Sequence, residues 1–198
     1  MDAVIPWSVN PMEQDSAKVE QGLHRGDPEV VDRLIEIYQH RLFRYLYSLS
    51  GNRALAEDLF QETWLRVLER GRQYRSKWKF EVWLFSIARH LAIDEARRKK
   101  GTSLDELMDP NEGTGFEPAA RDLSPSEELL AGEESDGIAE VLSRISGVYR
   151  EVLILRFQEE LALEEIAVIS QIPLSTVKSR LYRGLEAFRK LFEGDRHE

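Results

Sequence analysis

The residues whose types and spacing most clearly suggest chemistry lie near the end of the chain, at positions 176–183. Cations and hydroxyls recur there on one stripe of an expected helix, because residues three and four apart share a helix face. Such side chains donate hydrogen bonds to phosphates and to base edges in a DNA groove. The candidates for this contact are Thr176, Lys178, Ser179, Arg180, Tyr182 and Arg183.

A second group of residues mixes cations with aromatic rings over positions 70–100. This stretch holds ten basic and three acidic residues, with five aromatic residues among them. The mixture suits an unpaired nucleic acid strand, because cations follow the phosphates while aromatic faces stack on bases. Tyr74 and Trp78 precede a helix and are expected to be exposed, whereas Trp83 and Phe85 are expected in the core. The candidates for strand contact are Arg72, Tyr74, Arg75, Lys77, Trp78, Lys79, Arg97 and Arg98.

A third candidate surface is polar rather than basic. Asp58, Gln61 and Glu62 are three and four residues apart, so they share one face of an expected helix, opposite an apolar face. Composition alone leaves two interpretations open, a solvated helix face or a contact with another protein.

Several kinds of chemistry are not expected. The chain has no cysteine and four scattered histidines, so neither a disulfide nor a metal site is expected. It shows no glycine-rich phosphate loop and no nucleophile signature, so we expect neither an enzyme nor a cofactor. No apolar run reaches the roughly 18 residues of a membrane span, and the N-terminus lacks the character of a signal peptide. These features predict a cytoplasmic protein.

Charge is unevenly distributed along the chain. The net charge is −9, yet residues 28–100 carry +5 and residues 101–140 carry −11. Residues 101–135 also combine many acids with glycines, prolines and few periodic apolar positions, which is typical of a flexible linker. An inert spacer is the alternative interpretation of this segment. The domain boundaries expected are a tail at 1–21, a first domain at 22–100, the acidic linker at 101–135, a second domain at 136–193 and a tail at 194–198.

The expected fold class is all-α, with two small helical domains. Apolar residues at helical spacing predict helices from Pro28 to about residue 50, at 54–69 and at 80–99 in the first domain. In the second domain they predict helices at 138–145, 149–158, 163–170 and 175–192. Asp27 should cap the first of these helices, with Pro28 in its first turn.

The most specific pattern is a helix-turn-helix over residues 161–181. Two short helices are separated by Gln171-Ile172-Pro173, and the small Ala167 permits the helices to cross closely. The second helix carries the stripe of cations and hydroxyls, as the recognition helix of a DNA-binding protein does. The apolar wedge between the helices is expected from Ile166, Ile172, Val177 and Leu181.

Taken together, these segments resemble the extracytoplasmic-function sigma factors of bacterial RNA polymerase. The match covers about residues 22–100 and 138–192, and the order of its motifs around an acidic linker makes it specific. The matching motifs are Ala56–Trp64, Trp83–Arg89, Asp94–Arg98, Tyr149–Leu153 and Thr176–Arg183.

The resemblance implies a protein that directs promoter recognition and transcription initiation, in a stress or envelope response. Its first domain would recognise and open the minus-ten element, with His90 at a position linked to strand contact, and its second domain would read the minus-thirty-five element. Asp58, Gln61 and Glu62 would face the clamp helices of the largest polymerase subunit. The flap of the second largest subunit would be a further contact, and the linker would run towards the RNA exit channel. An anti-sigma factor is an expected partner that could hold the protein near the membrane, without membrane insertion.

Four positions depart from the residues usual in that family. His90 stands where Asn is usual, and Ser146 where Pro is usual. Ala162 replaces a Ser or Thr that caps the first helix of the helix-turn-helix, a loss of about 1 kcal/mol. Gln171 replaces a Gly in a turn that favours left-handed backbone, at a cost of about 1–2 kcal/mol. We therefore expect a less stable second domain with its DNA-reading stripe intact.

Two other functions compete with promoter recognition. A sigma-like decoy or adaptor would bind a regulator without DNA, which the acidic total favours, although the retained cations of the helix-turn-helix and of Arg97 and Arg98 argue against it. A stand-alone helix-turn-helix transcription regulator acting as a dimer would leave the first hundred residues unexplained.

Overall fold

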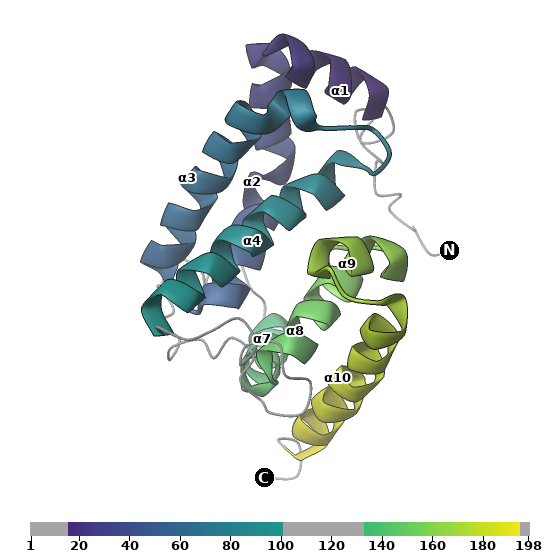
Figure 1. The fold of residues 1–198 in the computed structure, drawn as a ribbon. Coiled ribbons are helices and arrows are strands. Elements are labelled where there is room, and N and C mark those ends of the chain that lie inside the picture. The colour runs from purple at the N-terminus through teal and green to yellow at the C-terminus, as the bar shows by residue number, and fades with distance from the viewer. Residues whose placement is uncertain (1–15, 101–132, 195–198) are drawn as a thin grey trace, which may run out of the picture.

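The structure is a computed structural model that describes residues 16–100 and 133–194, and all the described elements are helical (Figure 1). The first domain, residues 16–100, contains four α-helices and a short 3-10 turn. The second domain, residues 133–194, contains four further α-helices and a π-helical turn. The elements in chain order are α1 (Ser16–Arg25), α2 (Pro28–Ser50), α3 (Arg53–Arg70), η1 (Gly71–Gln73), α4 (Phe80–Lys100), α7 (Glu133–Arg144), α8 (Gly147–Leu153), η2 (Ile154–Gln158), α9 (Leu163–Ser170) and α10 (Leu174–Gly194).

Helix boundaries in the first domain follow local capping chemistry. The Asp27 side chain accepts a hydrogen bond from the Glu29 amide at 3.0 Å, and Pro28 occupies the first turn of α2. This confirms the predicted cap, which satisfies an amide that the helix itself leaves unpaired. Gly51 ends α2 at a φ of 61°, and the Asn52 side chain then caps α3 by accepting from the Leu55 amide at 2.9 Å.

Helix α1 corrects the predicted N-terminal tail. We expected residues 1–21 to be a tail, but Ser16–Arg25 is helical. Val19 and Leu23 are buried in the core, which gives this helix an apolar face to pack. Gly22 lies so close to α2 that an added Cβ would meet Val30 at 2.5 Å. The first domain therefore begins at least as early as Ser16.

The helix-turn-helix forms as predicted, with the two weaknesses that its sequence implies. Gln171, in the turn between α9 and α10, has φ 55° and ψ 38°, the left-handed backbone expected there. Ala162 provides no side-chain cap for α9. Instead, the Ala162 amide donates to the Glu165 carboxylate at 2.8 Å, which satisfies one group at this helix start.

Three predictions for the second domain differ from the structure. Helix α7 begins at Glu133, inside the segment predicted as linker, and the rest of that predicted linker lies outside the described residues. The helix predicted at 149–158 is divided, because its last five residues form the π-helical turn η2. Helix α10 extends to Gly194, within the predicted C-terminal tail.

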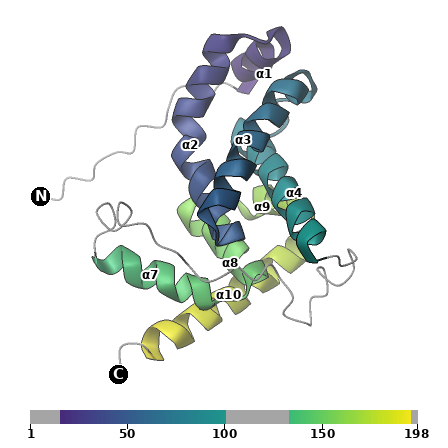
Figure 2. The ribbon, with the colours of Figure 1, turned by 90° about the vertical axis from the view of Figure 1, so that its left-hand side faces the viewer.

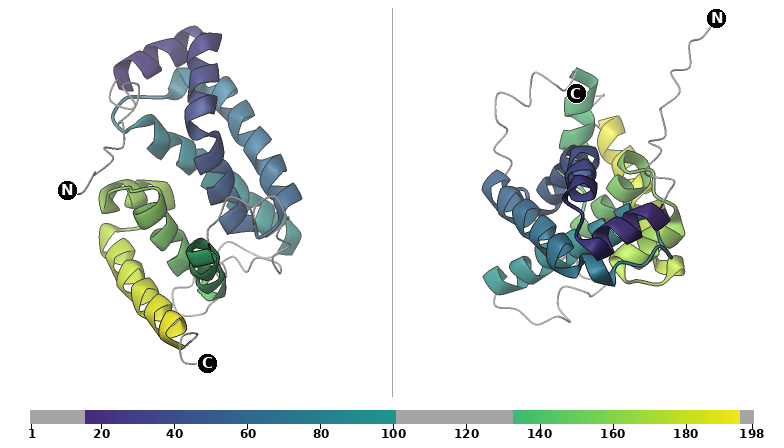
Figure 3. Two further views of the ribbon diagram at one scale, coloured as in Figure 1. Left: turned by 180° about the vertical axis from the view of Figure 1, so that it is seen from behind. Right: turned by 90° about the horizontal axis from the view of Figure 1, so that it is seen from above.

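The two domains pack against each other along one side of the first domain. Helix α9 lies on α4, and α8 lies beside the C-terminal part of α2 (Figures 1 and 2). Helix α10 is on the far side of α8 and α9 from the first domain, as the views in Figure 3 show. Buried side chains of α8, α9 and η2 join those of α2 and α4 in one continuous apolar cluster.

Candidate nucleic-acid and polymerase interfaces

Helix α10 presents the predicted recognition stripe to solvent. Lys178, Ser179, Tyr182 and Arg183 are exposed, with Tyr182 70% exposed, while Val177 on the opposite side is fully buried. Gly184, which is buried, allows α10 to pack closely against α8, because a Cβ added at this position would lie 3.2 Å from the Leu153 side chain. The second helix of the motif is therefore free to enter a DNA groove.

Two residues that were predicted in the stripe, Thr176 and Arg180, lie at its edge and are half-buried rather than exposed. Thr176 lies in the first turn of α10, and Arg180 turns towards the first domain. Burial lowers the pKa of Arg180, the nearby Arg89 acts in the same direction, and Glu151 opposes both. Arg180 is thus closer to the domain interface than to the centre of the stripe.

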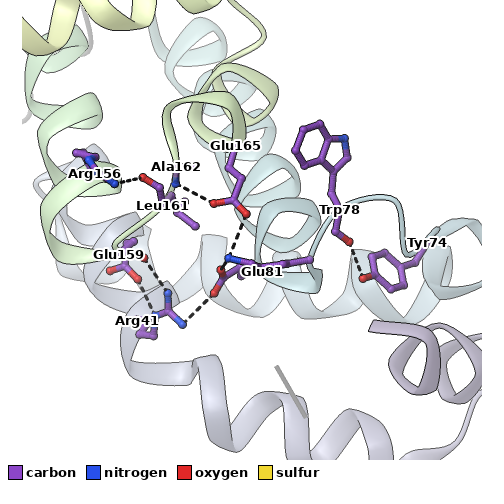
Figure 4. Close-up of polar contacts among 10 residues, drawn as sticks. Arg41, Tyr74, Trp78, Glu81, Arg156, Glu159, Leu161, Ala162 and Glu165 are labelled. Atoms are coloured by element: carbon purple, nitrogen blue, oxygen red, sulfur yellow. Dashed lines mark hydrogen bonds and ion pairs between the residues drawn. The ribbon is translucent and has the colours of Figure 1, made fainter. Parts of the chain in front are cut away.

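Tyr74, predicted to be exposed and to stack on a melted strand, is buried, and that prediction is wrong. Its side chain is 1% exposed and its ring packs against those of Phe80 and Trp83. Its hydroxyl donates to the Trp78 carbonyl at 2.9 Å (Figure 4). The aromatic ring therefore anchors the loop before α4 from inside, and burial raises the pKa of the Tyr74 hydroxyl.

The basic loop at 71–79 is also tied to helix α1. The Ser76 amide donates to the Glu20 carboxylate at 2.8 Å, and hydrogen bonding by Ser76 lowers the pKa of Glu20. His24 Nε2 lies 3.0 Å from the Tyr74 carbonyl oxygen and 2.9 Å from Arg75 Nη1. Arg75 also donates to two carbonyls of its own loop. Sequence analysis missed Glu20 and His24, because both fell in or beside the segment interpreted as a tail.

The remaining predicted strand-contact residues differ in exposure. Trp78 and Arg97 are half-buried, and Trp78 packs partly against the core. Lys79 Nζ lies 3.2 Å from Glu165 of α9, so one candidate cation is already paired with the second domain. Although burial opposes its charged form, Glu165 and Glu81 raise the pKa of Lys79. The exposed members are Arg72, Arg75, Lys77, Lys79, His90 and Arg98.

The polar face of α3 continues into an apolar one. Asp58 and Gln61 are exposed, and Glu62 is half-buried and paired with Arg66 at 2.9 Å. Leu65 and Leu68, which sequence analysis did not single out, are 53% and 58% exposed and extend the same line along the helix. Positions 58, 61, 65 and 68 have the alternating spacing of three and four that packs against another helix.

A group of ion pairs joins the domains just past the middle of α2. Arg41 Nε donates to Glu159 Oε2 at 2.8 Å, and another nitrogen of Arg41 lies 3.2 Å from Glu81 (Figure 4). Arg44 lies 3.7 Å from Glu159. Burial raises the pKa of Glu159, although Arg41 and Arg44 favour its charged form.

A second buried group lies further along the interface. Arg89 Nε donates to Glu151 Oε1 at 2.7 Å, and the Tyr45 hydroxyl donates to the same oxygen at 3.0 Å. Burial and Glu151 together raise the pKa of Tyr45 well above its ordinary value. The one sequence signal for this site was a glutamate inside an otherwise apolar helical run at residues 151–155.

Comparisons with known proteins identify the chain. The Sigma-70 region 2 family matches residues 34–102, and the Sigma-70, region 4 family matches residues 135–188. The ECF RNA polymerase sigma factor SigW of Bacillus subtilis is 34% identical over 169 residues, which cover 84% of this chain and 90% of the relative. The chain belongs to the extracytoplasmic-function (ECF) sigma factors. It is therefore a transcription initiation factor that directs promoter recognition.

Further relatives agree with this family assignment. SigM of Bacillus subtilis is 31% identical over 164 residues, covering 82% of this chain and 94% of the relative. CnrH in complex with the cytosolic domain of CnrY has a TM-score of 0.66 at 17% identity, covering 91% of this sigma factor and 98% of CnrH. RpoE in complex with NepR from Bartonella quintana has a TM-score of 0.63 at 23% identity, covering 82% of this sigma factor and 96% of RpoE. These two structures show that the fold is shared.

Two findings apply to the part of the chain that the structure describes. No helix there is long and apolar enough to cross a lipid bilayer. No group of three or more potential metal ligands occurs among the same residues.

Proposed function

We propose that the exposed face of α3 binds core RNA polymerase, and that α4, the loop before it and α10 contact promoter DNA. The observation that carries the proposal is the exposed stripe of Lys178, Ser179, Tyr182 and Arg183 on the second helix of a well-formed helix-turn-helix. Cations and hydroxyls on such a helix suit base edges and phosphates of the minus-thirty-five element.

The minus-ten element is assigned to the first domain. Trp78 offers a partly exposed ring, and Arg72, Lys77, His90 and Arg98 are exposed beside it or further along α4. Aromatic faces and cations together suit a melted strand. Tyr74 is not included, because its ring is buried.

The polymerase contact is assigned to Asp58, Gln61 and Glu62 together with the exposed Leu65 and Leu68. An exposed apolar surface beside polar groups is typical of a protein contact. Its spacing along α3 suits a helical partner such as the clamp helices of the largest subunit. The flap of the second largest subunit would meet the second domain.

An anti-sigma factor is proposed as the regulatory partner, and the cytoplasm as the location. The solved structure of RpoE contains an anti-sigma factor, NepR, and that of CnrH contains the cytosolic domain of CnrY. A stress or envelope response is the corresponding physiological role.

Competition for core polymerase tests the α3 assignment. The double variant D58K/Q61K should compete at least tenfold less well than wild type against a labelled sigma factor, because two exposed contacts are lost and the local charge rises. Q21K/D32K adds the same three positive charges at exposed positions of α1 and α2, so it is the matched control and should compete like wild type. Equal competition by D58K/Q61K and wild type, with unchanged circular dichroism, would remove the assignment.

A further inference from the structure

Helix α1 contacts the loop before α4 through a histidine whose ring nitrogen has two incompatible neighbours. His24 Nε2 lies 3.0 Å from the Tyr74 carbonyl oxygen, which accepts hydrogen bonds, and 2.9 Å from Arg75 Nη1, which donates them. A ring nitrogen either bears a hydrogen or offers a lone pair, so it satisfies only one of these neighbours at a time. The presence of a hydrogen on Nε2 therefore selects between the two contacts.

Arg75 is folded back onto its own loop. Its Nη1 donates to the carbonyls of Arg72 and Tyr74, at 2.9 Å each, in addition to its contact with His24. A neutral imidazole with a free lone pair on Nε2 is a further acceptor for this nitrogen. A protonated imidazole would instead place a second positive charge 2.9 Å from the guanidinium, and like charges at that distance repel.

The loop backbone is held by α1 whether or not His24 is protonated. Glu20 Oε2 accepts from the Ser76 amide at 2.8 Å, and Glu20 Oε1 lies 3.9 Å from His24 Nε2. A protonated ring would donate to the Tyr74 carbonyl and be attracted to Glu20, so both links to the loop remain. His24 also lies in the last turn of α1, where the helix dipole favours a cation. Protonation thus acts on the Arg75 side chain rather than on the path of the loop.

The charged groups around this contact are mainly cations. Gly71 of η1 packs on the last turn of α1, since an added Cβ would lie 3.2 Å from the Leu23 carbonyl oxygen. The two acids nearby in the chain are already engaged, Glu20 by the Ser76 amide and Asp27 by the Glu29 amide. The charged residues on the elements that meet here are Glu20, Arg25, Asp27, Arg70, Arg72 and Arg75.

We propose that His24 is a proton-dependent switch that holds Arg75 on the loop when neutral and releases it to a strand phosphate when protonated. The inference rests on the proposed function, because it takes this loop as part of the surface for the melted strand. Arg75 is exposed and lies close in the chain to the exposed Lys77, so a released guanidinium would extend the same cationic surface. Imidazole changes its charge between about pH 5 and 8, so strand binding should tighten in mild acid.

Nuclear magnetic resonance tests the switch directly on the full chain. Long-range proton–nitrogen correlations of the imidazole rings report which nitrogen bears the hydrogen, and H24Q identifies the His24 signals by their loss. At about pH 8, above the middle of the imidazole range, the ring should carry its hydrogen on Nδ1 and leave Nε2 free to accept from Arg75. A neutral ring with its hydrogen on Nε2 would overturn the proposal, because it would bond Tyr74 and could not hold Arg75.

Strand binding measures the consequence of the switch. Holoenzyme is assembled from core polymerase and each variant, core polymerase alone gives the background, and the probe is a pool of fluorescent random DNA strands of about 20 nucleotides, longer than one binding site. Between about pH 8 and about pH 6, the affinity of wild type should rise about fivefold more than that of H24Q, whose amide accepts from Arg75 but does not titrate. H40Q, which removes an exposed imidazole of α2, is the matched control and should respond like wild type.

Arg75 is tested separately as the group that His24 releases. R75Q should lose most of the pH response although it retains His24, and the salt slope of wild type should steepen by about 0.7 in mild acid, the value for one further phosphate contact to a single strand. A full pH response by R75Q would overturn the proposal, and so would equal responses by wild type and H24Q. Absence of strand binding by wild type at both pH values would instead remove the strand contact of the proposed function, together with this inference.

Discussion

At the scale of single residues, Arg180 and Arg183 of α10 differ in exposure, and we predict different roles for them. Arg183 is exposed in the stripe, whereas Arg180 is half-buried near Arg89. Arg183→Ala should reduce affinity for the upstream element by about 1–3 kcal/mol and relax the preference at one base pair, because a base contact carries sequence information. Selection from a randomised upstream element measures both effects.

Arg180→Ala is the companion variant. It should leave the selected sequences unchanged and alter only affinity or domain packing. If Arg183→Ala instead selects the wild-type sequences and lowers the salt slope by about 1, Arg183 contacts a phosphate rather than a base.

Glu159 gives a prediction about pH. Burial raises its pKa above the ordinary 4.5, so its contribution to stability is greatest below pH 4.5 and is lost as pH rises through the folded-state value. Glu159→Gln resembles the protonated acid. The Tm of this variant should therefore rise relative to the Tm of wild type as pH increases above 4.5. Thermal unfolding across pH 4–7 measures the difference.

Glu186 provides the control for that series, because its hydrogen bond with Lys190 lowers its pKa. The pH dependence of Glu186→Gln relative to wild type should be small and opposite in sign. A Tm difference between Glu159→Gln and wild type that stays constant with pH would show that burial does not perturb Glu159.

Residue types predicted the exposure of the α10 stripe better than the exposure of the loop before α4. Amphipathic spacing places Lys178 and Arg183 opposite the buried Val177, so the exposed face of α10 follows from the sequence. The loop before α4 has no such periodicity. Whether Tyr74 or Trp78 faces solvent depends on where α1 and α4 lie, and this information is not local.

At the scale of elements, helix α1 holds the strand-contact loop in place. Glu20→Ala removes the acceptor for the Ser76 amide and should reduce open complex on duplex promoter about two- to tenfold, with less effect on a pre-melted template. Permanganate footprinting on the two templates measures this. Glu20→Gln retains a carbonyl acceptor and should restore the activity, and equal losses on both templates would contradict a positioning role.

The helix-turn-helix contains two positions at which stability should be gained. Ala162→Ser supplies the missing cap of α9, and Gln171→Gly relieves the left-handed backbone, each worth about 1 kcal/mol. For a chain of this size, each change should raise Tm by about 2–4 °C in calorimetry. No gain from Ala162→Ser would indicate that Glu165 alone satisfies the start of α9.

Most elements could be predicted, because their boundaries have local causes. Asp27 and Pro28 start α2, and the Gln171-Ile172-Pro173 turn separates α9 from α10. Helix α1 was missed because it is short and only Val19 and Leu23 form its apolar face. The π-helical turn after Leu153 was missed because no residue pattern distinguishes it from a regular helix.

At the scale of the whole molecule, the sequence indicated two domains but not their contact. The interface joins residues far apart in the chain, since Arg41 and Glu159 are separated by 118 positions and Tyr45 and Glu151 by 106. Periodicity reports which side of a helix is apolar, but it does not report which distant carboxylate a buried arginine meets.

Run-off transcription with purified core polymerase tests the central claim, that this chain directs polymerase to promoters. On genomic fragments, wild type should produce transcripts from discrete start sites that share an upstream element, and D58K/Q61K should lose them together with polymerase binding. Arg183→Ala should shift start-site usage while polymerase binding is unchanged. Polymerase that binds this chain yet gives no chain-dependent start sites would contradict promoter recognition.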